Sequence, residues 1–157
     1  MKKEDIIKGK LSLVEWAHSL KAIPDDLWFQ PFREGSWGSA DVISHFISWD
    51  HFMIENRISH LVKNEPFPKM SIDVEEINKA ASTYARSGIT KVQLINELIS
   101  IRQRLVSLLG ELDSERFDMP LPGKEHITLV EYFVGMIEHD QKHITEINSF
   151  ISQNKES

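Results

Sequence analysis

Residues 128–151 read TLVEYFVGMIEHDQKHITEINSFI, and this stretch decides the fold class. Thr128 followed by Glu131 has the capping-box pattern that begins a helix. Apolar residues then recur at spacings of three and four, as on one face of a helix, and they are Leu129, Phe133, Met136, Ile147, Phe150 and Ile151. We therefore expect a final helix that reaches about Gln153 and buries one face in a core.

Polar residues interrupt this apolar stripe. His143 falls inside the stripe, and His139 lies about 40° beyond its edge by helical geometry. Residues four apart on a helix share a face, so the two imidazoles can reach one metal ion. Asp140 also faces inward. Burying such groups costs stability unless something satisfies them, and a shared ion would do so.

A third histidine, His45, lies on another expected helix, which begins near Gly38 or Ser39 and should reach about Lys63. Three protein ligands with an open fourth position are typical of a catalytic metal site. Apolar residues lie on the same side as His45 (Val42, Trp49, Phe52 and Met53) and on the opposite side (Ile43, Ile47, Ile54 and Leu61). A helix with two apolar faces is either central or part of an oligomer interface, and we favour a homodimer.

The remaining periodicity predicts helices over about 3–20, 73–86 and 90–112, the last starting at a capping box of Thr90 and Gln93. Prolines and glycines mark the connections, and no strand-like alternation competes with the helices. The prediction is an all-α fold, a four-helix bundle with a long crossover connection and one short extra helix. We expect one domain, residues 1–157.

Composition narrows the function classes. The chain has 18 basic and 24 acidic residues, a net charge of −6 and no Lys/Arg block, so we expect no nucleic-acid partner. Cysteine is absent, which removes disulfides, thiolate ligands and a cysteine nucleophile. There is neither a signal sequence nor an apolar run near the roughly 20 residues of a membrane span, so we expect a cytoplasmic protein without membrane contact.

Another interpretation of the histidines stays open. A histidine on an apolar face is more often a hydrogen-bonded core residue, and an H-x-x-x-H pair arises readily by chance among seven histidines. The chain would then be a metal-free structural dimer. Aromatic residues before the second helix could line a pocket, although packing is the commoner role, and they are Trp28, Phe29, Phe32 and Trp37.

Two motifs carry a resemblance to a known family. Residues 37–45, WGSADVISH, resemble the pattern W-S-x-x-[DE]-x-x-x-H, and residues 139–147, HDQKHITEI, resemble H-x-x-x-H-R-G-Q-[IL]. With the order of the helices, they make the chain similar to the DinB/YfiT-like family of helical-bundle metalloproteins. The resemblance implies that His45, His139 and His143 bind a divalent metal ion, commonly zinc, nickel or iron, in a homodimeric four-helix bundle.

The resemblance also implies an activity, although Gly38 stands where the family has Ser, and Ile144-Thr145-Glu146 replaces R-G-Q. We expect a metal-dependent enzyme that activates water, or a low-molecular-weight thiol cosubstrate, for hydrolysis or transfer. Asp140, with Asp50 and Glu138 as weaker candidates, would orient a ligand imidazole or act as a base. The alternative is a non-catalytic dimeric bundle that binds a metal or a small molecule in a stress response.

Overall fold

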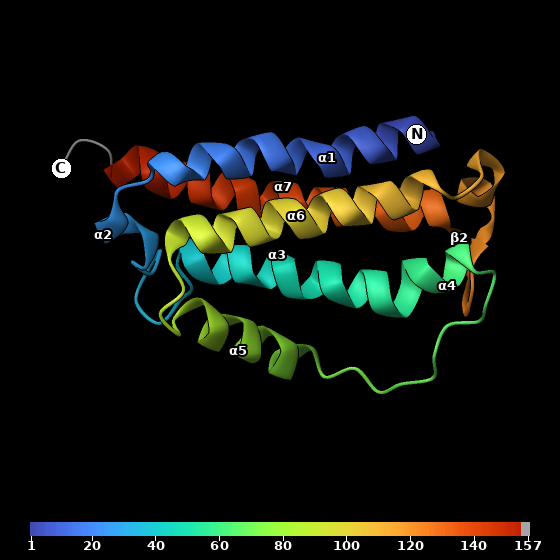
Figure 1. Cartoon of the computed structure of the whole chain (residues 1–157), viewed down its shortest axis with the longest axis horizontal. Coiled ribbons are helices and arrows are strands. Elements are labelled where there is room, and N and C mark those ends of the chain that lie inside the picture. Colours follow the sequence, from blue (N-terminus) through green and yellow to red (C-terminus); the bar gives the residue numbers. More distant parts are fainter. Residues whose placement is uncertain (155–157) are drawn as a thin grey trace.

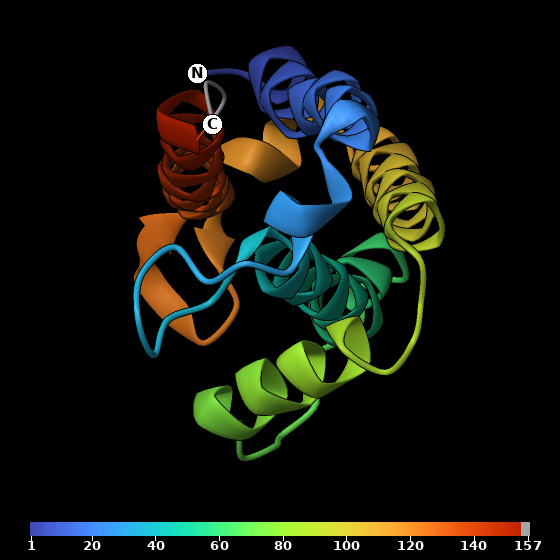
Figure 2. The same ribbon diagram turned by 90° about the vertical axis from the view of Figure 1, so that its left-hand side faces the viewer.

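The computed structural model describes residues 1–154, so the last three residues of the expected domain, 155–157, lie outside the described residues. Within this range, four long helices lie side by side as a bundle: α1 (Lys3–Ser19), α3 (Ser39–Met53), α6 (Lys91–Gly110) and α7 (Leu129–Asn154) (Figures 1 and 2). The expected all-α four-helix bundle is confirmed. The short extra helix, α5 (Val74–Ala85), packs against α3 on the outside of the bundle (Figure 2).

The second bundle helix is continuous but not uniform. After α3 the chain makes a π-helical turn, η2 (Ile54–Ile58), and ends with α4 (Ser59–Val62). The sequence predicts this helix to about Lys63, close to where α4 ends. A short 3-10 turn, η1 (Leu20–Ala22), and a single helical turn, α2 (Asp25–Trp28), precede α3.

The connection before α7 contains structure that the sequence does not reveal. A 3-10 turn, η3 (Ser114–Asp118), leads into an antiparallel hairpin of β1 (Pro120–Leu121) and β2 (Lys124–Thr128). The expectation of no strands is therefore wrong here. Strands of this length carry too little alternation to be recognised, and the tight turn depends on Gly123 with φ of 81°.

Both predicted capping boxes are present. Thr90 Oγ1 accepts a hydrogen bond from the Gln93 amide at 3.1 Å, and Gln93 Oε1 accepts one from the Thr90 amide at 3.1 Å. At the start of α7, Thr128 and Glu131 exchange the corresponding bonds at 3.2 and 3.0 Å. These reciprocal bonds satisfy amides that a helix start leaves without partners.

The start of α3 explains a departure from the family motif. A Cβ atom on Gly38 would lie 2.5 Å from the carbonyl oxygen of Gln30, so the chain has no room for the usual serine there. Asp41 supplies the cap instead, because its Oδ2 accepts the Gly38 amide at 2.8 Å. The same carboxylate accepts Arg86 Nη2 at 2.6 Å and Ser82 Oγ at 2.6 Å, which ties α5 to α3.

The two apolar faces of α3 are both covered within one chain. Helix α6 packs against α3 inside the bundle and α5 packs against it from outside, and residues from both faces, such as Val42 and Ile43, are fully buried. The two apolar faces of α3, which favoured a homodimer, are therefore buried without a second copy of the chain. None of the helices among residues 1–154 combines the length and apolar character that a membrane crossing requires.

Candidate metal centre

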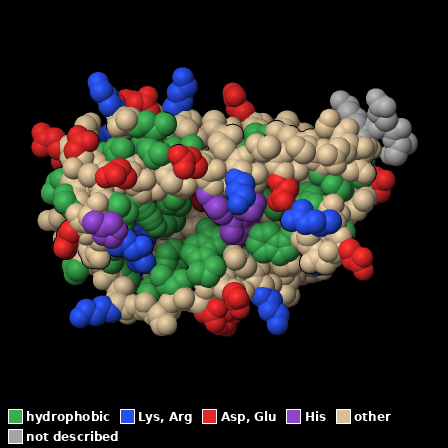
Figure 3. Space-filling view, turned by 180° about the vertical axis from the view of Figure 1, so that it is seen from behind, with side chains coloured by type: hydrophobic (Ala, Val, Ile, Leu, Met, Phe, Trp, Pro, Cys, Tyr) green, Lys and Arg blue, Asp and Glu red, His purple; other side chains and the backbone are tan. Residues whose placement is uncertain are grey.

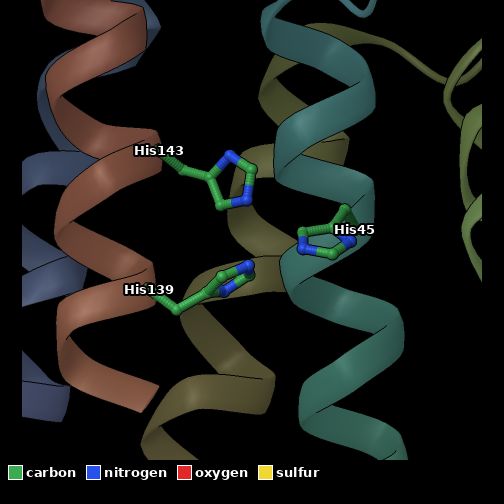
Figure 4. Close-up of side chains that lie close together, drawn as sticks. All are labelled: His45, His139 and His143. Carbon is green, nitrogen blue, oxygen red and sulfur yellow. The ribbon is translucent and has the colours of Figure 1, made fainter. Parts of the chain in front are cut away.

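The bundle brings the three predicted histidines together. His45 projects from α3 toward His139 and His143 on α7, which lie one turn apart (Figure 4). One ligand atom from each of the three lies within 4.8 Å of the others. The ring centroids are separated by 5.5 Å for His45 and His139, 5.0 Å for His45 and His143, and 4.6 Å within the pair.

The three histidines differ in how far they are exposed to solvent. His45 is buried, His143 is half-buried and His139 is exposed, so the cluster reaches the surface, where apolar side chains flank it (Figure 3). Burial lowers the pKa of His45 to about 4 and also lowers the pKa of His143, and the neighbouring imidazoles act in the same direction. Neutral imidazoles keep the nitrogen lone pair that a metal ion needs.

Asn78 on α5 fixes the orientation of His45, and sequence reasoning missed it. Asn78 Oδ1 accepts a hydrogen bond from Trp49 Nε1 at 2.9 Å and lies 3.0 Å from His45 Nδ1. Because an amide oxygen only accepts, His45 Nδ1 must carry the proton. The lone pair is then on Nε2, and Figure 4 shows a ring nitrogen of His45 facing the other two histidines. Such a hydrogen bond to the distal nitrogen is typical of metal-binding histidines.

Aromatic rings surround the cluster, although only one comes from the predicted group. Trp37 lies 5.1 Å from the His45 ring, and Phe46 lies 5.6 Å from the His143 ring. Trp28 is buried in the core, and Phe32 packs on Phe150. The aromatic residues before α3 thus serve mainly as packing.

A second polar cluster lies deeper in the bundle, and each of the four bundle helices contributes one residue to it. We call these residues, Lys10, Asp50, Arg102 and Asp140, the charged quartet. All are at most 6% exposed. Arg102 binds both oxygens of Asp50 at 2.7 and 3.1 Å and reaches Asp140 Oδ2 at 2.9 Å. Lys10 Nζ donates to the same Asp140 oxygen at 2.9 Å.

The quartet changes the roles expected for the acidic residues. Asp50 is fully engaged by Arg102, and Glu138 is exposed, so neither is placed to orient an imidazole. Burial would raise the pKa of Asp140, but Arg102 and Lys10 hold it below its ordinary value. Its Oδ2 binds these two cations, whereas its Oδ1 accepts no hydrogen bond in the described part of the chain.

A cavity of about 420 Å³ joins the two polar clusters. His45 and His139 line it on one side, and members of the charged quartet line its inner end. Its remaining walls are mostly apolar, from α3 and α7, with Val74 and Asn78 of α5 completing them.

The donor set fits a transition metal. Three imidazoles with an exposed side match the three-ligand arrangement of catalytic zinc sites, and imidazole also suits nickel and iron. Because His45 Nδ1 donates its proton to Asn78, Nε2 is unprotonated and its lone pair is available to coordinate a metal ion.

Comparison with known proteins identifies the family. The profile of the DinB superfamily matches residues 12–147. The chain belongs to the DinB superfamily. A search of curated proteins found no match.

Two solved structures show how widely this DinB fold is shared. YfiT from Bacillus subtilis, described as a probable metal-dependent hydrolase with an unusual four-helix bundle topology, is 18% identical with a TM-score of 0.74, over 99% of this chain and 89% of YfiT. The colibactin self-resistance protein ClbS, solved in complex with double-stranded DNA, is 22% identical with a TM-score of 0.67, over 98% of this chain and 94% of ClbS. At these identities the likeness shows the fold.

The ClbS complex corrects one expectation from composition. We expected no nucleic-acid partner because the DinB chain is acidic and has no basic block, but ClbS has the same fold and binds double-stranded DNA. That exclusion is therefore wrong. Net charge averages over the whole surface, whereas recognition depends on the local arrangement of charge.

Proposed function

We propose that this protein is a metal-dependent enzyme in which His45, His139 and His143 bind one divalent ion of zinc, nickel or iron. The observation that carries the proposal is the convergence of three imidazoles from two helices, with ligand atoms within 4.8 Å of one another. The hydrogen bond from His45 to Asn78 supports it, since it leaves Nε2 for the ion.

When bound there, the ion supplies Lewis acidity that lowers the pKa of a water molecule or of a thiol and so generates a nucleophile near neutral pH. Asp140 lines the cavity with His45 and His139, and we assign its Oδ1 the role of accepting a hydrogen bond from the nucleophile and so orienting it. Lys10 and Arg102 keep that carboxylate ionised and fixed. A thiol must arrive as a cosubstrate, because the chain has no cysteine.

The reaction class that we favour is hydrolysis, with transfer to a low-molecular-weight thiol as its variant. The description of YfiT as a probable metal-dependent hydrolase supports this choice. The alternative is a non-catalytic bundle that binds a metal or small molecule in a protective role, which the self-resistance function of ClbS favours. The homodimer and the cytoplasmic location expected from the sequence stay predictions.

Metal content tests the site directly. Tag-free protein, incubated with zinc or nickel and desalted, should hold about one ion per chain by plasma mass spectrometry. A variant with His45, His139 and His143 changed to Ala should hold none. The matched control changes three exposed histidines instead, His18, His51 and His126, and should keep its ion. Wild-type protein without metal would refute the proposal, and turnover with ester or thiol substrates separates the enzyme from the non-catalytic alternative.

A further inference from the structure

The cavity beside the histidines has the size and lining of a small-molecule site. Its volume of about 420 Å³ falls within the range of ligand pockets, roughly 300–1,000 Å³. Two of the three histidines, His45 and His139, form part of its wall. A molecule in this cavity would therefore lie against the side of the bundle where the metal site is proposed.

An exposed glycine, Gly135, forms part of the wall of this cavity. Gly135 lines the cavity one turn before His139, and a Cβ atom placed on it would meet nothing within 4 Å. Glycine inside a helix costs about 1 kcal/mol relative to alanine. Gly9 in α1 has a packing reason, since its Cβ would lie 2.7 Å from Ile137 Cδ1. Gly135 has no such reason, and the space it leaves adjoins the cavity.

The inner end of the cavity carries a cation with donors to spare. Lys10 is fully buried and lines the cavity, yet its ammonium makes one hydrogen bond among the described residues, to Asp140. An ammonium can donate three. Arg102 already directs four of its five N–H groups to Asp50, Asp140 and the Lys10 carbonyl, so Lys10 is the quartet member with the most donors left for a ligand. The opposite walls are apolar and aromatic, including Phe46, Phe52 and Met136.

We propose that this cavity binds the substrate of the metal site and that the substrate is a small organic carboxylate with an apolar body. The inference rests on the proposed function. The carboxylate would accept charge-assisted hydrogen bonds from Lys10, and the body would lie along the apolar walls beneath Gly135. The bond to be attacked would then face His45 and His139. The quartet is neutral overall, with two cations and two anions. A divalent ion bound by the histidines would therefore give the cavity a net positive charge, which favours binding of an anion.

The carboxylate preference is tested with 4-phenylbutyrate and the neutral 4-phenylbutan-1-ol, which share one apolar body. Calorimetry on the zinc-incubated full chain should show the acid binding at least fivefold more tightly than the alcohol. Lys10→Met should abolish this preference, whereas Lys8→Met, on the exposed face of α1, should retain it. Equal affinity of the two probes for the wild type, or binding of neither, would overturn the proposal.

A second variant tests the location and does not disturb the quartet. Gly135→Leu should weaken binding of 4-phenylbutyrate at least tenfold without lowering the unfolding temperature, because its side chain enters open space. Gly110→Leu at the end of α6, where a Cβ atom also meets nothing within 4 Å, should bind the probe as the wild type does. Unchanged probe binding in Gly135→Leu would overturn the cavity assignment.

Zinc content separates this inference from the proposed function. Gly135→Leu with wild-type zinc content and wild-type probe affinity would overturn the cavity assignment alone. Probe binding that Gly135→Leu and Lys10→Met both weaken, in a protein that holds no zinc, would refute the metal site and support the cavity.

Discussion

The bundle contains two polar regions, and they satisfy their buried groups in opposite ways. In the charged quartet, two cations and two anions from four helices neutralise one another through hydrogen bonds of 2.7 to 3.1 Å. In the histidine cluster, three imidazoles face one another, and within residues 1–154 their outward contacts are few: His45 Nδ1 is hydrogen-bonded to Asn78, and His143 Nδ1 lies 3.9 Å from Glu146 Oε1. Buried charges that neutralise one another stabilise the fold. Several imidazoles that face one another without bonding to each other instead indicate a ligand, such as a metal ion, between them.

The largest effect should come from breaking the quartet. Arg102→Met leaves Asp50 buried without its partner and should lower the free energy of unfolding by about 3–5 kcal/mol. Urea denaturation measures this, with the exposed Arg104→Met as the control. His139→Ala in metal-free protein should cost less than about 1 kcal/mol, because His139 is exposed. Equal losses in Arg102→Met and His139→Ala would contradict the contrast between the two regions.

The next effect concerns metal removal. An ion that binds only the folded protein adds about 2.7 kcal/mol at a free concentration of 100 times its Kd. Zinc should therefore raise the unfolding temperature of the wild type, and a chelator should reverse the shift. The variant that lacks His45, His139 and His143 should respond to neither. A quartet variant that still folds should keep the response, which would show that the two regions act independently.

A smaller effect should follow from Asn78→Ala, which removes the acceptor from His45 Nδ1. Loss of such an orienting partner typically weakens metal binding 10–100-fold. A competitive zinc titration with a chromogenic chelator measures it. Asn148 offers a matched control, since its Oδ1 accepts Trp16 Nε1 at 2.9 Å, as Asn78 accepts Trp49. If Asn148→Ala weakened zinc binding as much, the assignment of Asn78 would be wrong.

The smallest effect should be a gain. Gly135→Ala should raise the free energy of unfolding by up to about 1 kcal/mol, because alanine favours the helix and the added Cβ atom meets open space. Gly9→Ala should gain less, since Ile137 must move to accommodate it. Thermal unfolding of the metal-free proteins compares the two. A loss of stability in Gly135→Ala would mean that the glycine serves packing and not the cavity.

The bundle and its three histidines could be predicted because both depend on local periodicity. The two capping boxes and the apolar stripes mark where helices begin and which face is buried. Spacing alone places His139 and His143 on one face, and the stripe of α3 places His45 inward. The hairpin before α7 could not be predicted, since strands this short have no periodicity to recognise.

What could not be predicted depends on which helices become neighbours. The role of Asn78 requires α5 to pack on α3, and no pattern in the sequence indicates that contact. The sequence does contain one indication of the quartet, the position of Arg102. Arg102 follows Leu98 by four residues and precedes Leu105 by three, so it stands on the apolar stripe of α6. A charge at such a position needs a buried partner, although only the assembled bundle shows that the partner is Asp50.

The proposed metal ligands come from two helices that are far apart in the sequence, α3 and α7. His139 and His143 are one turn apart, so their pair exists as soon as that part of α7 is helical. His45 joins them only when α3 docks, because it comes from the second bundle helix. Two ligands hold an ion more weakly than three, so separation of α3 from α7 would release it. The dissociation rate of the ion would then measure how often the native bundle opens between these two helices.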